Sequence, residues 1–195
     1  KLSSGLRINS AADDAAGLVI SEKMEAQVVS LKQAGKNAQD AISFLQTADG
    51  ALSQSTDIIQ KMRELVIKAQ NTGTMTDNER SSITKELTSL RDELDRISNT
   101  TTFNTKKMLD GSLANEPATF HVGASTNSAD SINVYIADMS SKGLSTDGKT
   151  ELSIDISSQD AMKETLQGLD DALNKITKQR TELGVKEHRI NYTKK

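Results

Sequence analysis

The chain has 195 residues, with 24 basic and 27 acidic side chains, a formal net charge of −3 and no cysteine. Disulfides and thiolate-bound zinc are therefore excluded, and the absence of a strongly basic face argues against binding to nucleic acid. Aromatic residues make up only 3% of the sequence, so the core must consist mainly of Leu, Ile, Val and Ala, which suits thin packed helices.

The start of the chain is expected to be irregular. The first residue is Lys1 rather than Met, and we interpret the chain as a fragment whose natural ends have been removed. Residues 1–12 contain Gly, Ser and Asn without a clear period. Ser10 or Asp13 is a candidate N-cap for the helix that follows. No apolar run reaches the length of a membrane span, and no membrane partner is expected.

A long helix is predicted over residues 14–70. Apolar residues recur there at every seventh position, and a second row follows three residues after members of the first. A seven-residue repeat sustained over so many turns indicates a left-handed coiled coil with one seam against a partner. At 1.5 Å per residue such a helix is roughly 80 Å long. The first row is Met24, Leu31, Ala38, Leu45, Leu52, Ile59 and Val66, and the second is Ala34, Ala41, Ala48, Met62 and Ala69.

A second helix is predicted over residues 77–98. It is preceded by Thr76, and Glu79 follows three residues later, which is the signature of a capping box. The apolar positions that follow are spaced four, three, four and three residues apart, which predicts a narrow apolar seam. These positions are Ile83, Leu87, Leu90, Leu94 and Ile97.

The pattern changes over residues 100–157, where a small antiparallel β-section is predicted. Apolar residues alternate with polar ones, which is the period of half-buried strands. Asp-Gly pairs at residues 110–111 and 147–148 are turn signals, so hairpins are expected between the strands. The alternating residues are Phe120 and Val122, then Ile132, Val134 and Ile136, and finally Leu152, Ile154 and Ile156.

A third helix is predicted over residues 158–193, and it must run antiparallel to the first helix to pack along it. At Arg180 and Glu187 the row beside its apolar seam becomes polar, so packing is expected to weaken or to change partner there. The predicted fold is mainly α, with a small antiparallel β-section, in one elongated domain over residues 1–195. The apolar seam consists of Met162, Leu169, Ile176, Leu183 and Ile190, with Leu166 and Leu173 beside it.

A polar row on the first helix has two interpretations. Asp49, Thr56 and Arg63 occupy positions where a second apolar row would continue from Val28 and Ile42. In the first interpretation, the seam rotates around the helix and leaves the polar row in solvent. In the second, the polar row faces a neighbouring rod in an assembly. One sequence does not separate these alternatives.

Residues 3–17 read Ser-Ser-Gly-Leu-Arg-Ile-Asn-Ser-Ala-Ala-Asp-Asp-Ala-Ala-Gly, which resembles the N-terminal signature of bacterial flagellins. The resemblance implies the D1 core domain of that family, a helical rod with β-hairpins. It further implies that the terminal D0 helices and the outer D2 and D3 domains are absent. Further stretches resemble the family in the same order, namely residues 38–43, 47–52, 62–65, 93–98, 103–104, 109–111, 120–124 and 179–184.

The resemblance also implies a function. Flagellins are structural subunits of the extracellular filament used for motility, and they are exported through the flagellar type III system with an export chaperone. Their partners are other flagellin subunits, which join through the sides of D1 and through D0. Without D0, the fragment itself is expected to be monomeric. The alternative is the hook–filament junction protein, a relative that usually departs from the wording of residues 3–17.

A second implied partner is a host receptor. Flagellins of many bacteria bind Toll-like receptor 5 through the D1 helices. Lys61 stands where strongly stimulating members have Arg, and Lys68 where they often have Gln; an Arg-to-Lys exchange replaces a bidentate group by a point charge. The competing interpretation is a solvated helix face with Glu64 and Lys68 as an i,i+4 pair. The implied receptor residues are Gln60, Lys61, Arg63, Glu64, Leu65, Lys68, Ile83 and Glu86.

An enzymatic function receives little support from the sequence. His121 and His188 are the two histidines, they fall in different predicted elements, and neither belongs to a metalloprotease H-E-x-x-H motif. We therefore expect no catalytic residues, no cofactor and no metal.

Overall fold

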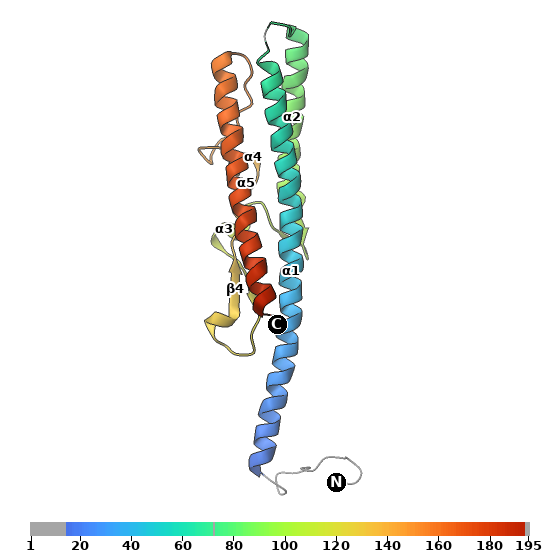
Figure 1. The fold of residues 1–195 in the computed structure, drawn as a ribbon, viewed down its shortest axis with the longest axis vertical. Helices are drawn as coiled ribbons and strands as arrows, with labels where there is room; N and C mark the ends of the chain where they lie inside the picture. Colours follow the sequence, from blue (N-terminus) through green and yellow to red (C-terminus); the bar gives the residue numbers. More distant parts are fainter. Residues whose placement is uncertain (1–14, 72, 194–195) are drawn as a thin grey trace.

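The computed structural model describes residues 15–71 and 73–193, which form an elongated helical rod with a β-section along one side (Figure 1). Helix α1 (Ala15–Ala69) runs the length of the rod, and α2 (Asp77–Thr100) and α5 (Gln159–Thr193) pack antiparallel to it. The predicted fold class, a mainly α antiparallel rod with a small antiparallel β-section, is confirmed. Residues 1–12, the candidate caps Ser10 and Asp13, and Asp14 lie outside the described residues.

The seam between α1 and α5 forms the centre of the hydrophobic core. Helix α5 buries all five positions of its predicted row, and α1 buries the last five of the seven positions of its first row. Small residues of α1, such as Ala41 and Ala48, have no exposed surface, which lets the two helices approach closely. Helix α2 adds a third wall with Ile83, Leu87 and Leu94. The principal seam residues are Leu45, Leu52, Ile59 and Val66 on α1, and Met162, Leu169, Ile176, Leu183 and Ile190 on α5.

The N-terminal end of the predicted seam on α1 is not covered by any of the described residues. Met24 is 61% exposed and Leu31 is 57% exposed. The pair Gln46–Glu187 sets a register in which Thr193, the last residue of α5 that the structure describes, lies at the level of Asp40. The seven-residue repeat therefore continues along α1 beyond the end of the described helix that could cover it.

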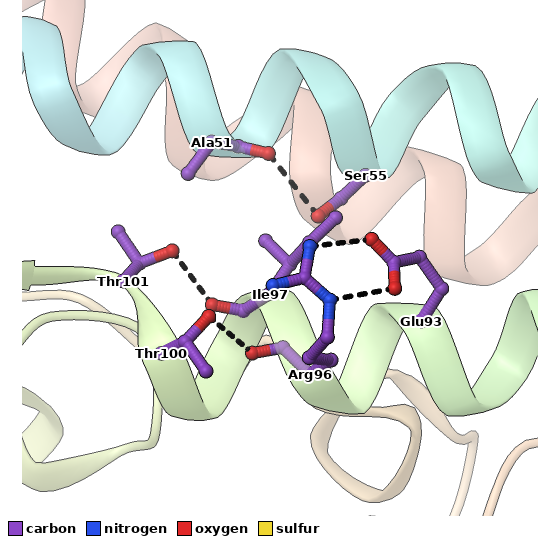
Figure 2. Close-up of polar contacts among 7 residues, drawn as sticks. All are labelled: Ala51, Ser55, Glu93, Arg96, Ile97, Thr100 and Thr101. Carbon is purple, nitrogen blue, oxygen red and sulfur yellow. Dashed lines mark hydrogen bonds and ion pairs between the residues drawn. The ribbon is translucent and has the colours of Figure 1, made fainter.

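Both ends of α2 are fixed by side chains. Thr76 accepts a hydrogen bond from the Glu79 N–H, and the Glu79 carboxylate accepts one from the Thr76 N–H at 2.8 Å, so the predicted capping box is confirmed. At the other end, the hydroxyls of Thr100 and Thr101 donate to carbonyls one turn earlier (Figure 2). The chain then turns extended at Thr101 and enters the β-section.

A buried serine interrupts the second apolar row of α1 and is paired within its own helix. Ser55 is 1% exposed, and its hydroxyl donates to the Ala51 carbonyl of the same helix at 3.3 Å (Figure 2). Its polar atom is therefore satisfied inside α1 and requires nothing from α2 or α5.

The β-section contains two short antiparallel pairs. Strands β3 (Ala118–His121) and β4 (Ser131–Val134) pair with Phe120 opposite Ile132, as the alternation predicts. Strands β1 (Thr102–Phe103) and β2 (Lys106–Lys107) are joined by a turn in which Asn104 and Thr105 both have positive φ. Short helices α3 (Ser112–Asn115) and α4 (Ser141–Leu144) and the 3-10 turn η1 (Ser128–Asp130) complete the section.

The third predicted strand, at Leu152–Ile156, is wrong. Leu152 and Ile156 are buried, but this extended segment has no strand beside it. Isolated contacts satisfy its backbone instead: the Leu152 N–H donates to the Ser141 carbonyl at 3.1 Å, and the Thr165 hydroxyl contacts both the N–H and the carbonyl of Asp155. Arg80 donates to the Ile156 carbonyl at 3.4 Å. Alternation of apolar residues predicted the extended backbone correctly, but not its partner.

Polar side chains of the long helices anchor the β-section to the rod. Asp95 of α2 accepts hydrogen bonds from both the N–H and the hydroxyl of Ser141, at 2.7 and 2.9 Å. Gln179 of α5 accepts from the Ala137 N–H and donates to the Tyr135 carbonyl, at 3.1 and 3.0 Å. Both anchors lie in stretches that resemble the flagellin family.

The capping box leads to a first prediction. Replacing Thr76 with Ala removes the hydrogen-bond acceptor for the Glu79 N–H and should lower the free energy of unfolding by about 1 kcal/mol. Chemical denaturation monitored by circular dichroism measures this difference. Ser81→Ala, at an exposed position of the same helix, is the control and should leave stability nearly unchanged. Equal losses in both variants would contradict the assigned cap.

The same cap predicts a dependence on pH. The hydrogen bonds from Thr76 lower the pKa of Glu79 in the folded chain. The stabilisation that these hydrogen bonds give to the ionised carboxylate is fully present above the pKa of glutamate in the unfolded chain. It is lost as the pH falls through the lower pKa of Glu79 in the folded chain. The stability difference between the native chain and Thr76→Ala should therefore narrow in acid.

Candidate functional site

A groove between α1 and α5 lies on the surface that the sequence assigned to a receptor. It has a volume of about 580 Å³. We call it the α1–α5 groove, and its lining residues are Gln60, Arg63, Glu64, Ile67, Asp170 and Leu173. It brings together polar groups from two helices around an exposed apolar side chain, Ile67, which is 47% exposed.

An ion pair closes one side of the α1–α5 groove. Arg63 Nε lies 2.8 Å from Asp170 Oδ1, and the two side chains are 45% and 41% exposed. A pair this exposed contributes only about 0.2–1 kcal/mol and is weakened by salt. Beside it, Lys61 Nζ lies 3.1 Å from Glu64 Oε2 on the same helix. The charged groups of this surface are therefore already partly paired within the chain.

The structure divides the eight predicted receptor residues into two groups. Leu65 and Ile83 are each 5% exposed and belong to the core, so their side chains are not presented to a partner. The set was carried over by sequence position, which does not take account of the helix face. Six residues are exposed: Gln60, Lys61, Arg63, Glu64, Lys68 and Glu86.

Sequence reasoning missed the contribution of α5 and of Ile67 to this surface. Ile67 belongs to neither apolar row of α1, and an apolar residue outside both rows is a signal of exposure that was available in the sequence. Asp170 and Leu173 belong to α5, and Asp170 lies 107 residues after Arg63, the residue that it contacts. Local periodicity contains no information about that pairing.

The polar row of α1 contacts α5, which neither sequence interpretation anticipated. Asp49 accepts two hydrogen bonds from Arg180, at 2.7 and 3.3 Å. These bonds with Asp49 raise the pKa of Arg180. Thr56 donates to the Leu52 carbonyl within α1. Polar pairs therefore take the place of apolar contacts where the second row of α5 becomes polar.

The two histidines lie apart, one in β3 and one in α5. His121 and His188 are exposed, and the His121 ring contacts the Ser131 hydroxyl at 3.1 Å. Within residues 15–71 and 73–193, no three His, Cys, Asp or Glu side chains are placed to hold a metal ion. In the same part of the chain, no helix has an apolar stretch long enough to cross a membrane.

Comparison with known proteins identifies the family. The family model described as the bacterial flagellin N-terminal helical region matches residues 1–114. The chain belongs to the flagellin family. It is 42% identical to a flagellin of Bacillus subtilis (strain 168), over 99% of the chain and 71% of that protein. It is 39% identical to the flagellar filament 30.7 kDa core protein of Treponema maltophilum, over 100% of the chain and 70% of that protein.

Solved structures agree with the assignment. The crystal structure of Bacillus cereus flagellin matches with a TM-score of 0.69 and 28% identity, covering 82% of this chain and 87% of that one. A putative flagellar hook-associated protein from Vibrio parahaemolyticus matches with a TM-score of 0.77 and 18% identity, covering 95% and 92%. That likeness shows the fold alone, so the hook–filament junction alternative is not favoured. As a flagellin, the chain is a structural protein and not an enzyme.

Burial at the candidate site leads to a prediction about stability. Leu65→Ala leaves a cavity in the core and should lower the free energy of unfolding by about 3 kcal/mol. Lys61→Ala, four residues earlier on the exposed face, should change it by less than about 0.5 kcal/mol. Chemical denaturation of the two variants measures both values. A loss below about 1 kcal/mol for Leu65→Ala would show that this side chain is not packed in the core.

Proposed function

We propose that the chain is the rod portion of a flagellar filament subunit, which assembles with other copies through the sides of the rod. Its family membership supports this proposal, because relatives over the whole chain are named flagellins and flagellar filament core proteins. The filament lies outside the cell, and the subunit reaches it through the flagellar type III system with an export chaperone. Terminal helices of the D0 type complete the assembly contacts.

The architecture suits this role. Helices α1, α2 and α5 form one continuous core, and the three cross-helix polar pairs, Gln46–Glu187, Asp49–Arg180 and Arg63–Asp170, tie α1 to α5 internally. A rod held by its own core can transmit force and present fixed side surfaces to its neighbours. The single observation that carries the proposal is the family match over residues 1–114.

Polymerisation provides the test. We expect the chain, extended at both ends with the terminal segments of the Bacillus subtilis flagellin, to grow filaments from short filament seeds under electron microscopy. The unextended chain is the control and should add no length to the seeds. A folded, extended chain that never elongates seeds under any condition would contradict the proposal.

We also propose that the α1–α5 groove binds host Toll-like receptor 5. The observation that favours this second role is the clustering of exposed Gln60, Arg63 and Glu64 around Ile67. The pairing of Lys61 with Glu64 and of Arg63 with Asp170 favours weak binding, because a partner must compete with these internal contacts.

Direct binding to the receptor ectodomain tests this second role. Lys61→Arg should strengthen binding, since a guanidinium can bind a carboxylate in a bidentate manner while still contacting Glu64. Arg63→Ala should weaken binding several-fold, and Lys163→Ala, on the exposed surface of α5 near its start, is the control. Absence of binding by the native chain and by Lys61→Arg would remove this proposal.

A further inference from the structure

Strand β4 has one edge that no described strand covers. Its register with β3, together with the bond from the Val122 N–H to the Asp130 carbonyl at 2.8 Å, directs the backbone groups of the even-numbered residues of β4 towards β3. The N–H and C=O groups of Asn133 and Tyr135 therefore face the other edge. Within the described part of the chain, nothing bonds to either backbone group of Asn133 or to the N–H of Tyr135.

Gln179 of α5 identifies the direction in which this edge points. Its carboxamide accepts a hydrogen bond from the Ala137 N–H at 3.1 Å and donates one to the Tyr135 carbonyl at 3.0 Å. With one donor and one acceptor, the carboxamide fills the place of a peptide group from a neighbouring strand. Two residues earlier, at Asn133, the same edge is unfilled. The edge therefore faces α5 and can accept a peptide backbone.

A groove lies between this edge and α5, and we call it the β4–α5 groove. Its volume is about 330 Å³. Its apolar lining consists of Val134, Tyr135, Leu183 and Val185, of which Tyr135 is 49% exposed and Val185 is 62% exposed. Figure 1 shows β4 beside the C-terminal half of α5. An exposed strand edge next to pockets for alternate side chains is what domains use to bind an extended peptide as an added strand.

We propose that the β4–α5 groove binds an extended peptide segment of a partner protein, which adds to β4 as an antiparallel strand. Antiparallel pairing is the more stable arrangement per residue. One peptide residue exchanges two hydrogen bonds with Asn133, and the Tyr135 N–H donates a third. The side chains on either side of that peptide residue point the same way as buried Val134, into the groove over Leu183 and Val185. The partner segment therefore carries two apolar residues separated by one polar residue.

The direction of β4 relative to α5 orients the peptide. Tyr135 is bonded to Gln179, and Gly143, later in the chain, accepts a hydrogen bond from Lys175, earlier in α5, at 3.1 Å. The chain from β4 onwards therefore runs antiparallel to α5. A peptide that is antiparallel to β4 runs in the same direction as α5.

The charges of the β4–α5 groove then specify the ends of the peptide. Glu182 and Lys186 line the groove one turn apart on α5. Neither forms an ion pair within the described residues. A peptide that follows the direction of α5 has its first residues near Glu182 and its last residues near Lys186. The complementary segment is therefore basic before its two apolar residues and acidic after them. This proposal does not depend on filament assembly or on receptor binding.

Amide hydrogen exchange measured by NMR tests the added strand. The probe is the peptide Ser-Lys-Val-Thr-Val-Glu-Ser with blocked ends, titrated into the native 195-residue chain. The amide protons of Asn133 and Tyr135 should exchange several-fold more slowly when the peptide is bound. That of Ile136, which already donates to the Leu113 carbonyl, should change little. No protection at the highest soluble peptide concentration would overturn the proposal.

A second peptide tests the direction of pairing. Ser-Glu-Val-Thr-Val-Lys-Ser has the same composition with the two charges exchanged, so it should bind several-fold more weakly. Equal binding of the two peptides would overturn the antiparallel register.

A pair of proline variants tests whether the backbone edge is used. Asn133→Pro removes an N–H from the open edge and should weaken binding of the first peptide at least tenfold. Thr119→Pro removes an N–H from the opposite edge of the same two-stranded sheet and is the matched control, which should bind normally. Circular dichroism verifies that both variants are folded. Equal affinities of the two folded variants would contradict strand addition.

A pair of surface variants tests the groove without altering the backbone. Val185→Glu should weaken peptide binding at least tenfold. Val29→Glu makes the same change on α1 at a side chain that is 60% exposed, and it should have no effect. Equal effects of the two substitutions would overturn the proposal. Self-association of the native chain that Val185→Glu abolishes would also overturn it, because the occupant would then be a second copy of this chain.

Discussion

The antiparallel packing of α1 on α5 is the contact on which the rest of the structure depends. The two helices lie at opposite ends of the described chain, so their contact closes the rod, with α2 and the β-section between them in the sequence. A coiled-coil seam made of Leu, Ile and Ala is strongly attractive but does not by itself select one register. The polar pairs Asp49–Arg180 and Arg63–Asp170 supply this selection, because a slip of one heptad would separate both.

The second constraint is the attachment of the β-section. Its two strand pairs are too short to be stable alone, and Phe44 of α1 packs edge-on against Phe103 and Phe120, with ring centroids 5.6 and 5.2 Å apart. Asp95 and Gln179 then fix its backbone to α2 and α5. The residues of two family-like stretches thus hold the β-section and the rod together.

Much of this arrangement can be predicted from the sequence, and the predictions that differ from the structure do so for physical reasons. Repeats of seven predicted the buried rows because each local contact has the same geometry. At Met24 and Leu31 the repeat extends beyond the level of Thr193, the last residue of α5 that the structure describes, so these side chains are exposed among the described residues. Alternation at Leu152–Ile156 predicted extended backbone but not the side chains that replace a neighbouring strand. The α1–α5 groove depends on Asp170, which only the tertiary register brings to Arg63.

The most direct test of this account is a distance measurement between the two long helices. Spin labels introduced at Glu64 and Asp171 of the cysteine-free chain report the register through double electron–electron resonance. The observed seam predicts one narrow distribution at a short separation, because the neighbouring residues Arg63 and Asp170 are in contact. A broad or double distribution, or a single one at a clearly longer separation, as a one-heptad slip of roughly 10 Å along the helix axis would produce, would contradict the seam as the element that sets the register of the rod.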